Sequence, residues 1–204
     1  MRKFIPIHLA VEDALSEAVL RQIVEQCRPD FAIGSCFRRG GYGYLKRTIN
    51  GFNQAARNLP FLVLTDLDQA ECPLAIITEW LSHPKHPNLI FRIAVREIEA
   101  WLLAHRDAFA DFLGIKAELI PSDVEAEDDP KRLLIELARK SRNRTLREAL
   151  VPPRKSTAQV GPDYNGRLIS FVEQNWKAKM AEPNAPSLRR AIAAISAFQP
   201  IWRE

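Results

Sequence analysis

One stretch limits the fold of this chain more than any other, the segment FLVLTDLD at residues 61–68. A short apolar run that ends in polar residues predicts a strand buried on both faces of a parallel sheet. Asp66 and Asp68 come where this strand is expected to end. Open α/β sheets bind ligands at the carboxyl ends of their strands. Because side chains two apart on an extended chain point the same way, both carboxylates can face one bound cation.

The rest of the first half repeats the order of a strand followed by a helix. The other predicted strands are residues 3–11, 31–34 and 88–95, and the predicted helices are residues 14–27, 45–58, 74–81 and 96–104. Four such units in a row predict an α/β fold with a parallel four-stranded sheet flanked by helices.

The second half of the chain predicts helices rather than further strands. They cover residues 131–141, 164–177 and 187–198, and a loop rich in Pro, Ser and Gly occupies residues 151–165. We therefore expect an α/β core over residues 1–116 and a basic helical C-terminal extension over residues 117–204, packed on the core as one compact unit.

Carboxylates stand at three of the four expected strand-to-helix junctions. They are Glu12 after the first strand, Asp66 and Asp68 after the third, and Glu97 and Glu99 after the fourth. Like charges held together repel one another unless a cation neutralises them, and oxygen ligands without paired soft ligands suit Mg²⁺ or Mn²⁺. The first three acids are the candidate metal ligands, with Glu97 or Glu99 assisting a second ion. Favourable charge at a helix start is the alternative for the junctions at Glu12 and at Glu97 and Glu99.

The net charge of +4 hides a contrast between the two parts of the chain. Residues 1–129 hold 14 Lys and Arg against 19 Asp and Glu, a net of −5, whereas residues 130–204 hold 15 against 6, a net of +9. A basic region of this kind is a footprint for a polyanion, nucleic acid first among them, and a solvated helical surface is the alternative. The candidate phosphate or nucleic-acid contacts are Arg38, Arg39, Lys46, Arg139, Arg142 and Lys155.

No apolar run is long enough to span a bilayer, and the first residues lack a signal-peptide cleavage pattern. We therefore expect a cytoplasmic protein without a membrane partner. Cys27, Cys36 and Cys72 are odd in number and show no metal-binding spacing, which favours free thiols.

The placement of Glu12 after the first strand and of the Asp66-x-Asp68 pair after the third resembles the TOPRIM domain of topoisomerases, primases and overcoming-lysogenisation-defect nucleases. In that family a glutamate and a DxD pair bind divalent metal for phosphoryl transfer on nucleic acid. Asp13 stands where the family often has glycine.

Over nearly its whole length the chain also resembles domain-of-unknown-function family 4276, a bacterial family. The segments that carry this resemblance are Val11-Glu12, Thr65-Asp66-Leu67-Asp68, Arg96-Glu97-Ile98-Glu99-Ala100-Trp101-Leu102-Leu103, Asp129-Pro130-Lys131, Gly161-Pro162-Asp163-Tyr164-Asn165 and Pro186-Ser187-Leu188-Arg189-Arg190. The resemblance implies a TOPRIM-like protein of a phage-defence or similar mobile system, sometimes found beside an ATPase.

Three functions remain open at this point. The first is a metal-dependent nuclease or phosphodiesterase that uses Glu12, Asp66 and Asp68 and acts on DNA or RNA. The second is a non-catalytic TOPRIM-like subunit that docks on an ATPase or another partner. The third is a phosphatase-like or nucleotide-processing enzyme with the same acids. DNA or RNA preference, metal number and oligomeric state do not follow from the sequence.

Overall fold

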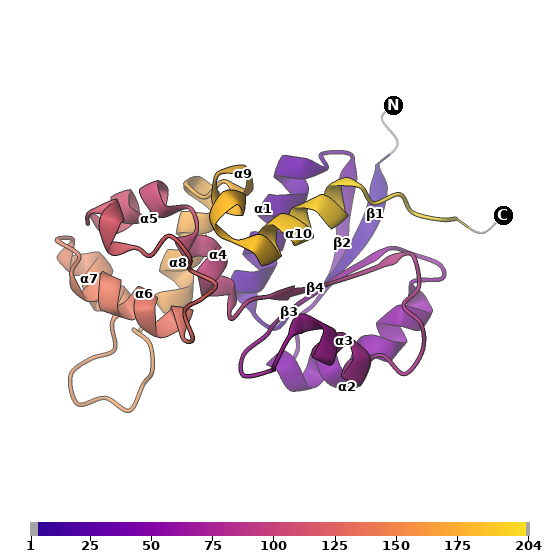
Figure 1. Cartoon of the computed structure of the whole chain (residues 1–204), viewed down its shortest axis with the longest axis horizontal. Helices are drawn as coiled ribbons and strands as arrows, with labels where there is room; N and C mark the ends of the chain where they lie inside the picture. The colour runs from indigo at the N-terminus through magenta and orange to yellow at the C-terminus, as the bar shows by residue number, and fades with distance from the viewer. Residues whose placement is uncertain (1–3, 203–204) are drawn as a thin grey trace.

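A computed structural model describes residues 4–202 and contains one parallel sheet of four strands (Figure 1). The strands are β1 (Ile5–Ala10), β2 (Phe31–Phe37), β3 (Phe61–Asp66) and β4 (Leu89–Ala94), in the order β2-β1-β3-β4. β3 lies inside the sheet between β1 and β4, and its first five residues are buried. The α/β prediction is confirmed, and the uninterrupted apolar run of β3 is explained by burial on both faces.

Helices cover both faces of this sheet (Figure 1). α1 (Ala14–Cys27) and α10 (Pro186–Ser196) pack on the face to which Leu62 and Leu64 point. α2 (Gly41–Ala55) and α3 (Pro73–Trp80) pack on the opposite face, against Phe61 and Val63. The alternation of β3 side chains between two cores follows from the two-residue period of an extended chain.

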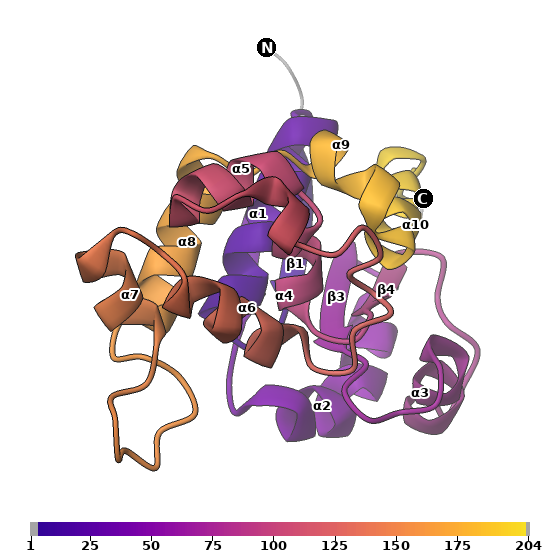
Figure 2. The ribbon, with the colours of Figure 1, turned by 60° about the vertical axis from the view of Figure 1, so that its left-hand side comes forward.

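The remaining helices pack beside α1 and around the carboxyl end of β4, with α9 near the C-terminal end of α1 (Figure 2). They are α4 (Ile98–Leu103), α5 (Arg106–Leu113), η1 (Ala117–Leu119), α6 (Pro130–Arg139), α7 (Arg144–Leu150), α8 (Tyr164–Gln174), α9 (Ala178–Ala181) and η2 (Glu182–Asn184). Buried residues of α6, α8 and α10 belong to the same hydrophobic cluster as α1 and β1. The extension and the sheet therefore share a core, and the edge where the junction acids lie is covered by helices.

Buried polar contacts fix this helical part to the sheet. The Ser187 hydroxyl accepts from the indole N–H of Trp101 at 2.7 Å and from the backbone N–H of Val95 at 3.2 Å, and it donates to Glu125 at 2.6 Å. At the other end of α10, the Arg28 guanidinium donates to the carbonyl of Phe198 at 2.5 Å. These anchors set α10 along β4.

Several element boundaries differ from the sequence-based prediction. β2 runs three residues further than expected, to Phe37, because it continues to pair with β1 after an irregularity between Ile7 and Leu9. The helix expected over residues 45–58 begins earlier, at Gly41, and Gly40 before it has a φ of 79°. Helices α5 and α7 were not predicted. Within residues 4–202 no helix is long and apolar enough to cross a membrane.

Candidate functional site

Glu12 and Asp66 meet at the carboxyl ends of two neighbouring strands. Asp66 is the last residue of β3, and Glu12 follows β1, which pairs with β3. Glu12 Oε1 accepts a hydrogen bond from the backbone N–H of Asp66 at 3.0 Å and another from the hydroxyl of Thr65. Burial raises the pKa of Glu12, although these two hydrogen bonds oppose the effect. The expected convergence of the first and third junctions is therefore present.

Although the charge of Asp66 helps to raise the pKa of the nearby Lys131, the Asp66 carboxyl group lacks a full set of hydrogen bonds. Its Oδ1 atom is buried and forms no hydrogen bond with residues 4–202. Burial, followed by the negative charges of Glu99 and Glu12, raises the pKa of Asp66 well above its ordinary value. A buried acceptor without a donor costs about 1–3 kcal/mol, so the fold places this group at the expense of stability.

Glu99 brings the fourth strand into the same site. It lies in the first turn of α4, just after β4, and is only 2% exposed. Its Oε1 accepts from the Tyr164 hydroxyl at 3.0 Å, whereas Oε2 is buried without a partner among the described residues. Burial raises the pKa of Glu99 to about 7, although the nearby Lys131 ammonium opposes the rise. Burial and the negative charge of Glu99 in turn raise the pKa of Tyr164.

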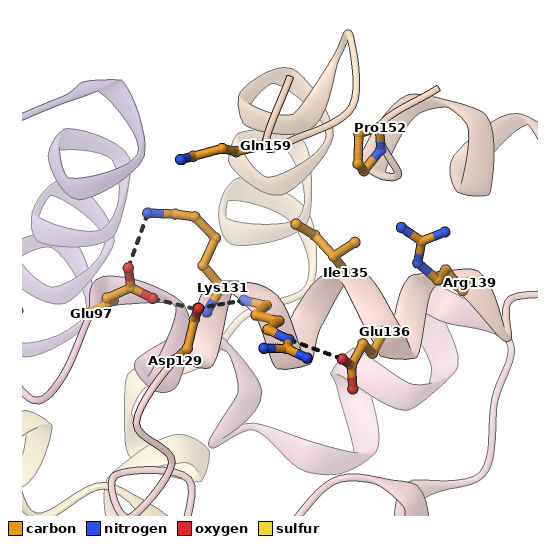
Figure 3. Close-up of a pocket in the computed structure, with 9 residues that line it drawn as sticks. Glu97, Asp129, Lys131, Ile135, Glu136, Arg139, Pro152 and Gln159 are labelled. Atoms are coloured by element: carbon orange, nitrogen blue, oxygen red, sulfur yellow. Dashed lines mark hydrogen bonds and ion pairs between the residues drawn. The ribbon is translucent and has the colours of Figure 1, made fainter. Parts of the chain in front are cut away.

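Glu97 points toward Lys131 at the start of helix α6 (Figure 3). Its carboxylate accepts from the Lys131 backbone N–H at 2.9 Å and from Lys131 Nζ at 3.2 Å. Lys131 Nζ also lies 3.6 Å from Glu99 Oε1. Burial lowers the pKa of Lys131, but the charges of Glu99 and Glu97 outweigh it and raise the pKa overall, so the ammonium stays charged. Of the two glutamates left open by the sequence, Glu99 is the one whose charge acts on Asp66.

Asp68 lies in the turn after β3 rather than on the strand. It is exposed and has a φ of 47°, and its backbone N–H donates to the Arg96 carbonyl at 2.9 Å. The two carboxylates were expected to point the same way, as side chains two apart on a strand do, but the strand ends at Asp66 and Asp68 is not part of it. Asp68 nevertheless adds negative charge to both Glu12 and Asp66.

The donor chemistry of this cluster fits a hard divalent cation. Asp66 Oδ1 and Glu99 Oε2 are buried carboxylate oxygens without hydrogen bonds among the described residues, and the negative charges of Glu99 and Glu12 raise the pKa of Asp66. A cation bound between them would satisfy both atoms and remove the repulsion. Within the described part of the chain, however, no three His, Cys, Asp or Glu side chains are already close enough together to hold a metal ion.

The structure separates the predicted phosphate contacts. Arg38 follows β2 directly and lies 3.5 Å from Glu17, and Arg39 beside it is exposed. Both are at the sheet edge that carries Glu12, because Val11 N–H bonds the Phe37 carbonyl at 3.0 Å. The charge of Lys46, by contrast, is neutralised by Glu79 at 2.7 Å on the face of the sheet covered by α2 and α3.

The remaining three predicted contacts belong to the helical part. Arg142 and Lys155 are exposed, and neither lines a hollow that Arg139 lines. Arg139 lines a hollow of about 550 Å³ between α6 and the loop of residues 151–160, at whose other end lie Lys131 and Glu97 (Figure 3).

Lys131 and Tyr164 were not among the predicted site residues. Both lie in short segments that carried the family resemblance, Asp129-Pro130-Lys131 and Gly161–Asn165. In the sequence each is a charged or hydroxyl-bearing residue at the start of a predicted helix, one to three positions after Pro or Gly. That pattern does not distinguish a helix start from a site residue until the helix is packed against α4.

These features define an α/β protein with an acidic site at the carboxyl ends of its strands. No protein-family model matches the chain, and no curated protein matches it. The chain is similar in structure to the C-terminal region of the Burkholderia pseudomallei OLD protein, with 15% sequence identity, a TM-score of 0.44, and coverage of 94% of this chain and 97% of that one. A likeness at this level carries no argument about activity, and the fold class stated above follows from the sheet itself.

Proposed function

We propose that the chain is a divalent-metal-dependent phosphoryl-transfer enzyme, specifically a nuclease that acts on DNA or RNA. The observation that carries this proposal is the placement of Glu12, Asp66 and Glu99 after three neighbouring strands, where the charges of Glu99 and Glu12 act on Asp66 and two buried carboxylate oxygens lack partners among the described residues. Perturbed acids gathered at one site are typical of catalysis, and this arrangement destabilises the fold unless a ligand compensates it.

Glu12, Asp66, Asp68 and Glu99 are the residues that would hold Mg²⁺ or Mn²⁺. A bound ion there would polarise a phosphodiester oxygen and activate water as the nucleophile. Lys131 orients the site by holding Glu97 on the side of α6 and by offsetting the charge of Glu99. Glu12 keeps Oε2 clear of hydrogen bonds from residues 4–202, which leaves that oxygen to take up a proton.

Cleavage of labelled single- and double-stranded DNA and RNA with Mg²⁺ or Mn²⁺ tests the proposal. The Asp66→Asn/Asp68→Asn double variant should lose about 10³-fold or more in rate, the several kcal/mol that a bound ion supplies. Asp107→Asn, outside the site, is the matched control and should cleave as the parent does. Absence of cleavage of all four substrates by the parent protein with either ion would refute the proposal.

A non-catalytic subunit is the second candidate, because Lys131 already neutralises Glu97 and Glu99 and no metal-ready group of three ligands is formed. In that case the protein docks on an ATPase or another partner, as the resemblance to a phage-defence family implies. Such a subunit would show no cleavage, and the double variant would bind its partner fully. Activity on mononucleotides but not on polymers would instead favour a nucleotide-processing enzyme.

A further inference from the structure

A second hollow, of about 560 Å³, adjoins the one that ends at Lys131. Arg139, Arg147 and Arg154 line it, together with Glu148 and the apolar wall of residues 151–153. The Glu148 carboxylate is already bound by Arg144 at 2.8 Å, and Arg144 does not line the hollow. Arg147 also donates to the Ser141 carbonyl at 2.6 Å, whereas Arg139 and Arg154 form no ion pair among the described residues, so positive charge predominates around this space.

The two hollows are neighbours, because Arg139 and Pro152 line both. Figure 3 shows Lys131, Ile135 and Arg139 in a row along one face of α6, the spacing of i, i+4 and i+8. Within the first hollow the other charges are paired, as in the 3.2 Å contact of Arg132 with Glu136. Attraction for an anion is therefore concentrated in the second hollow, which we call the arginine hollow.

The length of α6 sets how large an occupant must be to reach both ends. Lys131 and Arg139 are eight residues apart on this helix, or about 12 Å at 1.5 Å per residue. Successive nucleotides of a helical strand advance by about 3.4 Å, so three or four are needed to cover that distance. A mononucleotide cannot occupy the arginine hollow and reach Lys131 at once.

The size of the hollows favours one strand over two. Each has the volume of a small-molecule site, roughly 300–1,000 Å³. A duplex, whose major groove alone is about 12 Å wide, does not fit into such a space. Neither hollow is lined by an aromatic ring, so stacking with bases is absent from both and contacts to the phosphate backbone remain.

We propose that the two hollows form one channel for a single nucleic-acid strand. The arginine hollow binds backbone phosphates, and the strand passes along α6 toward Lys131, whose Nζ lies 3.6 Å from Glu99 Oε1. The strand polarity and the site of attack rest on the proposed nuclease function, whereas binding in the channel does not. The channel defines the substrate class as a strand of at least three or four nucleotides, read without regard to sequence.

Fluorescence anisotropy in EDTA, with labelled oligonucleotides of two to twelve nucleotides, separates binding from cleavage. In the Arg139→Gln/Arg154→Gln variant, affinity for an eight-nucleotide strand should fall about 10- to 100-fold through loss of charge-assisted contacts. The slope of log K against log salt should also decrease by about 1.4, or 0.7 for each lost phosphate contact. Arg147 is kept, because its Nη1 donates to the Ser141 carbonyl at 2.6 Å and holds the turn before α7.

The matched control is Lys140→Gln/Arg189→Gln, which removes the same charge from exposed positions outside both hollows. It should change affinity by less than about threefold. Equal losses in the two variants, a dinucleotide that binds as tightly as an eight-nucleotide strand, or a duplex that binds as tightly as one strand would each overturn the channel.

The two proposals fail separately. If the arginine variant loses strand binding while the parent cleaves nothing with Mg²⁺ or Mn²⁺, the channel stands and the nuclease fails. If Asp66→Asn/Asp68→Asn abolishes cleavage while the arginine variant binds and cleaves as the parent does, the nuclease stands and the channel fails.

Discussion

Glu99→Gln tests whether the buried acid at the start of α4 is held ready for a cation. In the metal-free protein the pKa of Glu99 is about 7, against an ordinary value of 4.5 for glutamate in the unfolded chain. Between these two pH values the folded state binds more protons than the unfolded state, so the free energy of unfolding falls as the pH rises. The pKa values differ by about 2.5, and each unit corresponds to 1.36 kcal/mol, which gives a loss of about 3 kcal/mol from pH 4.5 to pH 7.

Thermal and urea unfolding in EDTA across pH 4.5–7.5 measures this contribution. The parent should lose about 3 kcal/mol more stability than Glu99→Gln over this range, or roughly 6–12 °C in Tm for a chain of this size. Excess Mn²⁺ at pH 7 should restore stability to the parent but not to the variant, by about 2.7 kcal/mol at 100 times Kd.

Glu71→Gln is the control, because Glu71 is exposed and has no ion pair among residues 4–202. Its pH profile should follow that of the parent. Identical pH profiles for the parent and Glu99→Gln would refute the argument, since Glu99 would then titrate as an ordinary surface carboxyl group.

Three further substitutions have outcomes that follow from the contacts. Asp66→Asn should raise the free energy of unfolding of the metal-free protein at pH 7 by about 1–2 kcal/mol, measured in urea, because it removes a carboxylate that Glu99 and Glu12 repel and whose Oδ1 atom has no hydrogen bond among the described residues. A destabilised variant would argue against this repulsion. Ser187→Ala should lower the free energy of unfolding by about 2–3 kcal/mol, because it leaves the Trp101 N–H and part of the Glu125 carboxylate without a hydrogen bond. Ser156→Ala, in the exposed loop, should change it little. Gly161→Ala should cost about 1–3 kcal/mol or prevent folding, because a Cβ there would meet the Ala149 carbonyl oxygen at 2.2 Å; unchanged Tm values would contradict this packing.

The buried strand and its acids could be predicted because their signals are local. The apolar run of β3 and the position of Glu12 after β1 depend only on neighbouring residues, and the parallel pairing of the strands follows from the strand–helix order. The same reasoning places Arg38 and Arg39 near Glu12, since the carboxyl ends of β1 and β2 are adjacent.

Other parts of the site depend on contacts between distant segments. The choice between Glu97 and Glu99 is made by Lys131, which comes from α6 and attracts Glu97 by two hydrogen bonds. Lys46 was expected to meet phosphate, but the preference of its ammonium for Glu79 across helices α2 and α3 is a tertiary effect. Helix α7 was missed because it has only seven residues, so its buried Leu146, Ala149 and Leu150 give a helical pattern of a single turn.

Crystals soaked in Mn²⁺ and measured at the manganese absorption edge give the most direct test of the central claim. We expect an anomalous peak in contact with Asp66 and Glu99, with Glu12 or Asp68 completing the oxygen ligands, and no such peak in crystals of Asp66→Asn. Anomalous density elsewhere only, with Asp66 Oδ1 and Glu99 Oε2 still unbound at saturating Mn²⁺, would contradict the claim that these carboxylates form a metal site.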